Sequence, residues 1–379
     1  MSSEQTYTFS SESVSEGHPD KVCDYIADSI LDACLEEDPH SHVAAEVMCK
    51  HNTVVLGGEI STNAKLNYEE ITRRAIREIG YCDPAEPFCA ESVQVLILVS
   101  KQSNEINAGV VKATDDQKEQ GAGDQGIMFG YASDESPELM PLPILLAHRL
   151  TEGLAQDRRS GKCDWLRPDA KSQVSLVYRG NTPVEVATVL ISTQHTPSVS
   201  QGEIAEYVRK TLAPRVLGQW HNPGAEYIVN PSGSFVLGGP SADCGVTGRK
   251  IIVDSYGGAG RHGGGAFSGK DPSKVDRSGA YYCRHVARRI VSSGLARKAE
   301  VQVAYAIGRA KPLSIKVDTF GTGDPLRAEK FVAETFDFRP ANIIKELSLL
   351  QPIYKQTTNY GHFGKAGLPW ETAVVPATV

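Results

Sequence analysis

The chain has 379 residues, a length that predicts two or three domains around a large apolar core. Hydrophobic residues make up 40% and charged residues 22% of the sequence, as in ordinary globular proteins rather than disordered chains. The net charge of −7, without a long Lys/Arg run, argues against nucleic acid as a partner. The sequence has no run of about 18 apolar residues and no signal-peptide pattern at its start, so we expect no membrane partner.

The eight cysteines are dispersed along the chain and form neither a CxxC pair nor a cluster with zinc-ligand spacing. Dispersed cysteines among apolar neighbours are typical of reduced thiols in a protein core. Their use here predicts a cytoplasmic location, where disulfides are rare.

The first part of the chain predicts the order helix, hairpin, helix, strand. Residues 20–37 carry apolar side chains at helical spacing, and residues 42–50 and 53–60 are typical of two strands joined by a short turn. Residues 68–80 predict a helix that ends at a glycine cap. Residues 92–100 predict a buried strand.

A polar loop over residues 101–126 follows, and a loop of this length inside a compact protein predicts a functional segment such as a lid. Beyond it the pattern of helices and hairpins continues. We expect helices over 141–160, over 201–216, from the glycine-rich stretch at 257–274 to about Ser293, and again at the C-terminal end. We expect strands over 172–180, 184–193, 227–239 (two strands and a turn), 249–256, 301–308 and 313–321.

Hairpins that alternate with single helices predict an α+β fold rather than the strict βα alternation of a parallel sheet. The helix–hairpin–helix pattern recurs about three times along the chain. This recurrence is a weak indication of three similar domains.

The stretch GGAGRHGGGAFSGKDPSK, residues 257–274, is the strongest candidate for a phosphate site. Residues 264–270 match the P-loop pattern, but Asp271 replaces the expected Ser/Thr and the preceding predicted strand ends too early. Bare glycine backbone still lets N–H groups approach phosphate oxygens. Asp271 and Pro272 predict an N-cap and a helix start flanked by Lys270 and Lys274, although a flexible glycine linker is the alternative.

A second helix start lies in GHPDK, residues 17–21, with His18 as the candidate N-cap and Pro19 at the first helical position. His18 could donate to a phosphate oxygen, and Asp20 could hold a divalent cation. The alternative is plain helix capping, with Asp20 serving the helix dipole.

Two further polar stretches carry candidate ligands. GGPSADCGVTGRK (238–250) ends in the cations Arg249 and Lys250, which suit a polyphosphate, or are merely a solvated pair. In RPDAKSQ (167–173), Asp169 could accept from ribose hydroxyls and Lys171 could add a cation, or the stretch is an ordinary polar loop. GAGDQG (121–126) matches a dinucleotide motif, but no apolar strand precedes it.

Candidate carboxylates for metals, besides Asp20, are Asp276, Glu46 and Glu59. Glu46 lies in an apolar strand, where a lone carboxylate is costly unless it is paired, or else it faces outward into solvent. The sequence contains neither an HExxH motif nor a Ser-His-Asp signature.

Six motifs in order carry a family resemblance: GHPDK (17–21), GAGDQG (121–126), RPDAKSQ (167–173), GGPSADCGVTGRKIIVDSYGG (238–258), RHGGGAFSGKDPSKVDRS (261–278) and YGHFG (360–364). Together they resemble the S-adenosylmethionine synthetases over nearly the whole chain. The resemblance implies three similar β-α-β-β-α-β domains around a pseudo-threefold axis, interleaved along the chain. Their approximate ranges are 5–103 (N-terminal), 118–236 (central) and 237–375 (C-terminal).

The resemblance also implies an activity, the joining of ATP and L-methionine into S-adenosyl-L-methionine. The methionine sulfur attacks C5′ of the ribose and displaces the triphosphate, which is then hydrolysed to phosphate and pyrophosphate. A thioether has no proton to lose, so the first step needs no general base. The enzyme must instead stabilise the charge of the leaving triphosphate with fixed charges and hold the two substrates in position.

The resemblance assigns roles to residues of this sequence. Catalytic roles fall to His18, near the bond that breaks, and to Lys270, Arg249 and Lys171. The ATP site comprises His18, Asp169, Lys171, Phe235 (stacked on adenine), Asp243, Arg249, Lys250, Ala266 and Lys270. The methionine site comprises Glu59, Gln102, Asp243 and Lys274. The metal ligands are Asp20 and Asp276 for Mg²⁺ and Glu46 for K⁺.

By the same resemblance we expect two Mg²⁺ and one K⁺ per site, and a homotetramer built from two dimers with active sites at the dimer interface. Loop 101–126 contains the segment that acts as a gate in the family. Relatives usually have Arg where this chain has Ser234 in PSGSF, which removes one cation from the expected nucleotide site. The alternatives are an ATP-dependent kinase with a degenerate P-loop and a non-catalytic nucleotide-binding subunit.

Overall fold

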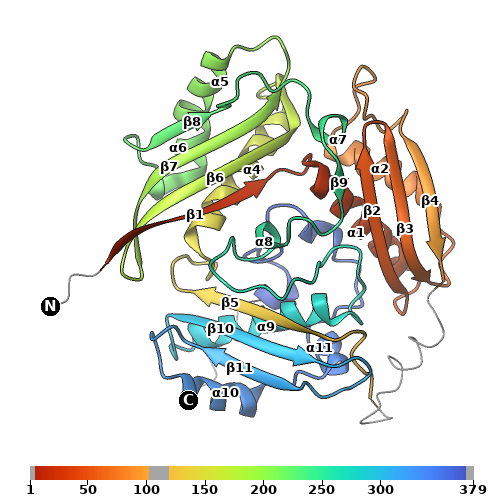
Figure 1. The fold of residues 1–379 in the computed structure, drawn as a ribbon, viewed down its shortest axis with the longest axis vertical. Coiled ribbons are helices and arrows are strands. Elements are labelled where there is room, and N and C mark those ends of the chain that lie inside the picture. Colours follow the sequence, from red (N-terminus) through yellow and green to blue (C-terminus); the bar gives the residue numbers. More distant parts are fainter. Residues whose placement is uncertain (1–4, 102–118, 373–379) are drawn as a thin grey trace.

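The structure is a computed structural model that describes residues 5–101 and 119–372. Three β-sheets lie around a central region that holds helices α1, α8 and α9 (Figure 1). Within the described ranges, no helix combines the length and the apolar character needed to cross a membrane.

The first sheet has the strand order β4-β3-β2-β9. β2 and β3 form an antiparallel hairpin in which Val47 faces Leu56, β4 runs parallel to β3, and β9 pairs with the other edge of β2. Its elements are α1 (Pro19–Glu37), β2 (His42–Lys50), β3 (Thr53–Ser61), α2 (Tyr68–Ile79), β4 (Gln94–Ser100) and β9 (Gly245–Val246). Gly80 caps α2 in the left-handed conformation, as predicted.

The second sheet has the order β1-β6-β7-β8, with an antiparallel β6–β7 hairpin and a parallel β8. The predicted helix over 201–216 is three consecutive pieces, the middle one a π-helix. The elements are β1 (Thr6–Val14), α4 (Leu142–Arg159), β6 (Leu166–Arg179), β7 (Thr182–His195), α5 (Gln201–Tyr207), η1 (Val208–Leu212), α6 (Ala213–Leu217), η2 (Gly218–Trp220) and β8 (Glu226–Val229).

The third sheet has the order β11-β10-β5, and all its strands are antiparallel to their neighbours. Its elements are β5 (Gly126–Ser133), α9 (Val275–Ser292), β10 (Lys298–Tyr305), β11 (Ser314–Asp318), α10 (Pro325–Thr335) and α11 (Pro340–Glu346). Four short helices complete the described chain: α7 (Gly239–Ala242), α8 (Ile251–Asp254), η3 (Lys355–Thr357) and η4 (Pro369–Glu371).

The three sheets repeat one plan, in which a helix leads into an antiparallel hairpin and a second helix. In each sheet the first hairpin strand also pairs with an antiparallel strand from a distant part of the chain: β9 with β2, β1 with β6 and β5 with β10. This arrangement confirms the α+β class and the interleaving of three similar units. The contiguous ranges 5–103, 118–236 and 237–375 stay a prediction, because each sheet draws one strand from outside them.

Several predictions about elements were wrong or incomplete. Residues 249–256 contain the short helix α8 rather than a strand, and the second strand predicted within 227–239 is irregular backbone. Strand β4 exists, but its outer side is exposed rather than buried: Leu98 retains 69% of its accessible surface. Strands β1 and β5 were not predicted at all.

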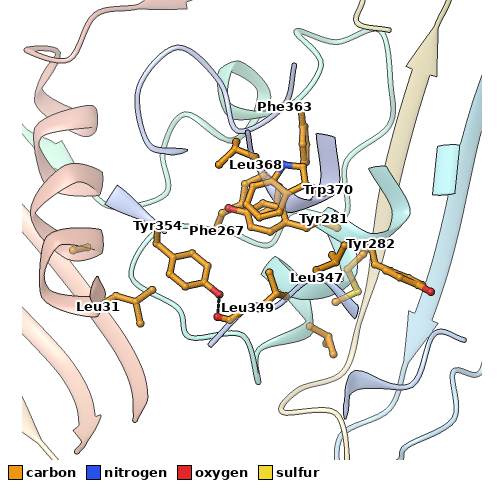
Figure 2. Packing of buried hydrophobic residues seen from close by; sticks show 14 of the residues in the cluster. Leu31, Phe267, Tyr281, Tyr282, Leu347, Leu349, Tyr354, Phe363, Leu368 and Trp370 are labelled. Atoms are coloured by element: carbon orange, nitrogen blue, oxygen red, sulfur yellow. Dashed lines mark hydrogen bonds between the residues drawn. The ribbon is translucent and has the colours of Figure 1, made fainter. Parts of the chain in front are cut away.

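An aromatic core lies beneath the glycine-rich stretch (Figure 2). The ring of Phe267, which belongs to that stretch, meets Tyr281 of α9 and His362 at centroid distances of 5.5 Å and 5.0 Å. Tyr281 in turn stacks on Trp370 at 3.8 Å. The YGHFG motif therefore has a packing role, since its His362 and Phe363 are buried in this core. One aromatic side chain thus fixes a segment that is otherwise mostly glycine.

Candidate active site

The first part of the site is the N-terminus of α1. His18 is the N-cap and Pro19 occupies the first helical position, as predicted. The His18 Nδ1 atom accepts a hydrogen bond of 3.2 Å from the Asp20 amide, so the neutral ring carries its proton on Nε2. Burial, together with the positive charges of Lys250 and Lys171, lowers the pKa of His18 to about 3, although Asp20 opposes the shift. The His18 ring is therefore a neutral donor through Nε2 at pH 7.

Asp20 ties this helix end to the loop that carries Arg249 and Lys250. Its Oδ2 lies 2.6 Å from the Lys250 ammonium, and its Oδ1 accepts the Val246 amide at 3.0 Å. Burial alone would raise the pKa of Asp20, but these two hydrogen bonds together with the positive charge of Lys250 outweigh burial, and the pKa is lowered. The Arg249 guanidinium lies 3.9 Å from the same carboxylate with 58% of its side chain exposed, which leaves it available to an anion.

Strand β6 brings Asp169 and Lys171 to the same place. Asp169 is buried; its Oδ2 accepts the Gly239 amide at 2.8 Å, while its Oδ1 has no hydrogen-bond partner among the described residues. Burial raises the pKa of Asp169 to about 6, against the opposing effect of the Gly239 bond and of Lys171. A buried carboxylate oxygen without a partner is a candidate acceptor for a ligand hydroxyl group.

Two other nucleotide candidates adjoin Asp169. Asp243 is close enough for its charge to contribute to the raised pKa of Asp169. Phe235 is half-buried and lies against Gly238, where an added Cβ would come within 2.9 Å of the phenyl ring. The structure therefore brings the predicted ribose and adenine residues together around Gly238 and Gly239.

The glycine-rich stretch forms the second part of the site. The Lys270 ammonium lies 2.6 Å from Asp276 in the first turn of α9. A Cβ at Gly265 would lie 2.1 Å from the Asp276 carboxylate, so only glycine permits this close approach. Ala266 lies against the loop that carries Arg249 and Lys250, because a Cβ at Gly248 would come within 2.4 Å of the Ala266 methyl group. The two loops are thus in contact.

Glu46 and Glu59 lie beside this second part, on the outer face of the first sheet. Both side chains are exposed, as expected for outward-facing strand residues. Partial burial raises the pKa of Glu46, and the nearby charge of Lys270 opposes the rise. Glu46, Glu59 and Lys270 therefore share one region of the surface.

Lys274 directly precedes α9, a helix whose start differs from the prediction. Its ammonium pairs with Asp271, and Asp271 also accepts the Val43 amide at 2.7 Å and the Ser273 amide at 2.9 Å. Helix α9 begins at Val275 with Lys274 as its N-cap, so the predicted helix start at Asp271 and Pro272 was wrong. Asp271 is engaged in tertiary contacts with β2 instead of capping a helix. Gln102, the other methionine candidate, lies outside the described residues.

The carboxylates fit a magnesium site of the kind completed by substrate. Within the described residues, no three His, Cys, Asp or Glu side chains gather to form a metal cage. Asp20 and Asp276 are instead separate carboxylates, each already holding an ammonium group at 2.6 Å. Mg²⁺ is commonly bound by one or two carboxylates together with the phosphates of its nucleotide, which this donor set allows.

Sequence reasoning overlooked a set of buried charges behind the site. Lys21 lies 2.6 Å from Asp254 and 2.9 Å from Asp24, while Arg277 lies 2.6 Å from Asp28. All five side chains are almost fully buried. The signal was present in the sequence as aspartates at every fourth position of α1, but the helix was interpreted from its apolar residues alone.

Comparisons with known proteins agree with the resemblance. The family models described as S-adenosylmethionine synthetase N-terminal, central and C-terminal domains match residues 6–104, 119–235 and 237–372. An S-adenosylmethionine synthase of Akkermansia muciniphila is 53% identical over 379 aligned residues, covering 98% of this chain and 96% of its own length. One from Sorangium cellulosum is also 53% identical, covering 96% of this chain and 87% of its own length.

Proposed function

The chain belongs to the S-adenosylmethionine synthetase family, and on that premise we propose that the two contacting loops and the α1 N-terminus form its catalytic site. The enzyme makes S-adenosylmethionine from ATP and methionine. Full-length similarity to such synthases sets aside the kinase and regulatory-subunit alternatives. The observation that carries the proposal is the convergence of His18, Arg249 and Lys250 on one carboxylate, Asp20, with the charge of Lys171 close to His18.

The cations of the site take up the charge of the leaving triphosphate. Lys270, Arg249 and Lys171 act on the phosphate chain as catalytic groups, while Lys250 and the backbone at Ala266 bind it. The His18 Nε2–H donates to the oxygen that departs from C5′, and the thioether sulfur attacks that carbon without a base. Donors fixed in advance by the fold act where charge develops, which is the most effective form of electrostatic catalysis.

The remaining contacts orient the two substrates. The unpartnered Oδ1 of Asp169 accepts from ribose hydroxyls, and Phe235 stacks on adenine. Asp243 contacts both substrates, and Glu59, Gln102 and Lys274 bind methionine. Ser234 leaves one expected cation out of the nucleotide site.

Family members use metal ions, and we assign Asp20 and Asp276 to two Mg²⁺ ions and Glu46 to one K⁺ ion. Bound Mg²⁺ neutralises phosphate charge and polarises the phosphoryl oxygens. Lys250 and Lys270 neutralise the same two carboxylates from within the protein.

We further propose a homotetramer of two dimers in the cytoplasm, with each site completed by the partner subunit. The outer face of the first sheet supports this, because exposed Met48, Leu96 and Leu98 adjoin Glu46 and Glu59. An exposed apolar face next to ligand residues is typical of an interface.

Leu98→Asp should therefore shift the protein to smaller species in sedimentation experiments, and activity should fall with assembly. Leu326→Asp, at an equally exposed position on α10, is the matched control and should leave the assembly unchanged. An unchanged tetramer in the Leu98 variant would remove this face from the interface.

The test of the chemistry is product analysis. The protein is incubated with ATP, methionine, Mg²⁺ and K⁺, and the products are identified by mass. We expect S-adenosylmethionine with phosphate and pyrophosphate in equal amounts. Free tripolyphosphate as the final product would separate the synthetic step from the proposed hydrolysis.

A further inference from the structure

Helix α1 carries a row of aspartates at every fourth position: Asp20, Asp24, Asp28 and Asp32. Residues four apart lie on one face of a helix, so the row forms a single line. Each aspartate accepts at least one backbone N–H from a distant segment. The donors are Val246 (3.0 Å) for Asp20, Gly248 (2.8 Å) for Asp24, Gly269 (2.8 Å) for Asp28, and Tyr354 and Lys355 (2.9 Å and 2.8 Å) for Asp32.

The two middle bonds fix the residues that precede the site cations. Gly248 stands directly before Arg249 and Lys250, and Gly269 directly before Lys270. Both glycines have left-handed backbone, with φ of 75° and 80°. Glycine has unusual conformational freedom, so a loop that turns at glycine depends on an external contact to hold its direction.

Asp24 and Asp28 are themselves held rigidly and are shielded from any ligand. Both are fully buried. Lys21 lies 2.9 Å from Asp24, and the Arg277 guanidinium meets both oxygens of Asp28 at 2.7 Å and 2.6 Å. Asp28 is thus hydrogen-bonded at both oxygens, whereas Asp24 accepts the Gly248 amide at Oδ1 and holds Lys21 at Oδ2 by an ion pair. Buried charges held by such contacts favour one geometry.

We propose that Asp24 and Asp28 are positioning residues that set the two cationic loops in register on a single helix. Their separation of one helical turn, about 6 Å along the axis, fixes how far Arg249 and Lys250 lie from Lys270. The inference rests on the proposed function, because it takes these loops to bind one triphosphate. Asp24 and Asp28 touch no substrate and act only through the loop backbone.

Asp24 provides the cleaner test, because Lys21 keeps its bond to Asp254 when Asp24 is replaced. In Asp24→Leu the Gly248 amide loses its acceptor while the buried volume is retained, and Asp24→Ala is the second variant. Asp24→Asn keeps a side-chain oxygen and is the rescue variant. Asp32→Leu is the matched control, since Asp32 is in the same row but holds Tyr354 and Lys355 rather than a cationic loop.

The probes are inorganic tripolyphosphate with Mg²⁺, measured by calorimetry, and the separate KM values for ATP and methionine. Asp24→Leu should weaken tripolyphosphate binding and raise the KM for ATP by about tenfold or more, because the half-buried Gly248 amide loses its acceptor and the loop its fixed direction. The KM for methionine should change little. Asp24→Asn should restore most of the affinity, and Asp32→Leu should lower the melting temperature without changing either constant.

Equal effects of Asp24→Leu and Asp32→Leu on tripolyphosphate affinity would overturn the inference, as would failure of both Asp24→Leu and Asp24→Ala to fold. Lys250→Ala and Lys270→Ala in the same assay test the underlying site. If these two variants lose affinity and Asp24→Leu does not, only the positioning role is wrong. If the lysine variants bind normally, the proposed site itself is wrong.

Discussion

The lysines of the two cationic loops are paired in different ways. Lys250 pairs with Asp20, which lies 230 positions away in the chain, whereas Lys270 pairs with Asp276, only six positions away. The first pair exists only when two distant segments are folded together, while the second is made within one segment. The difference teaches that the ion pair of Lys270 is local whereas that of Lys250 needs α1 in place, although α1 holds the backbone of both loops.

The largest effect is expected where the local Lys270–Asp276 pair is broken. Lys270→Ala should lower kcat by at least ~10²-fold, because one fixed donor to the departing phosphate chain is lost. The check is steady-state kinetics with saturating ATP and methionine. Lys330→Ala, which removes an exposed lysine of α10, is the control and should behave like the wild type. Unchanged turnover would take Lys270 out of the mechanism.

A substitution of His18, the neighbour of the Lys250–Asp20 pair, tests the site at the α1 N-terminus. His18→Asn should slow sulfonium formation by roughly 10²-fold through loss of the Nε2–H donor, and should affect hydrolysis of added tripolyphosphate far less. Asparagine is a favourable N-cap, so α1 should keep its start and the fold its stability. Single-turnover measurement of the two steps distinguishes them, and equal losses in both would reject the assigned role.

The smallest effect concerns the stability of the native protein and depends on Asp169, which lies near Lys250 of the 245–250 loop. The pKa of Asp169 is about 6 in the fold, above the ordinary value of about 3.9 in an unfolded chain. The native state thus binds this proton more tightly, so ionisation of Asp169 lowers stability as pH rises from about 4 to about 6. Asp169→Asn cannot ionise and so lacks this pH dependence. The free energy of unfolding of the variant minus that of the wild type should therefore rise by about 2 kcal/mol between pH 4 and pH 6.

Denaturant titrations of both proteins between pH 4 and 7 provide the measurement for Asp169→Asn. The variant should also show a raised KM for ATP, because an amide presents one oxygen where the carboxylate presents two. A stability difference that does not change with pH would show that burial of Asp169 has no such energetic consequence.

Local patterns in the sequence predicted the elements that depend on local interactions. Helix α1 and strands β2 and β3 follow from periodicity, and the His18 cap follows from its neighbour Pro19. Residues 249–256 were predicted as a strand because Ile and Val favour strands. In the fold this segment contains the short helix α8, whose Asp254 meets Lys21, a contact 233 positions away that no local propensity contains.

The same difference between local patterns and contacts of distant segments applies to the candidate site. The family motifs predicted its residues, and glycine next to lysine predicted phosphate binding. What the sequence could not supply was the pairing of Lys250 with Asp20, or the exposure of Leu98 on a strand whose run of apolar residues resembled a buried one. Both depend on which segments the fold brings together.

The exchange of strands among the three sheets has a consequence for how the molecule comes apart. A cut that removed residues 6–14 would strip an edge from the sheet of β6 and β7, and a cut after β4 would leave β2 without β9. No third of the described chain can be excised as a self-sufficient fragment. Melting should therefore proceed as one cooperative event, with the three units lost together.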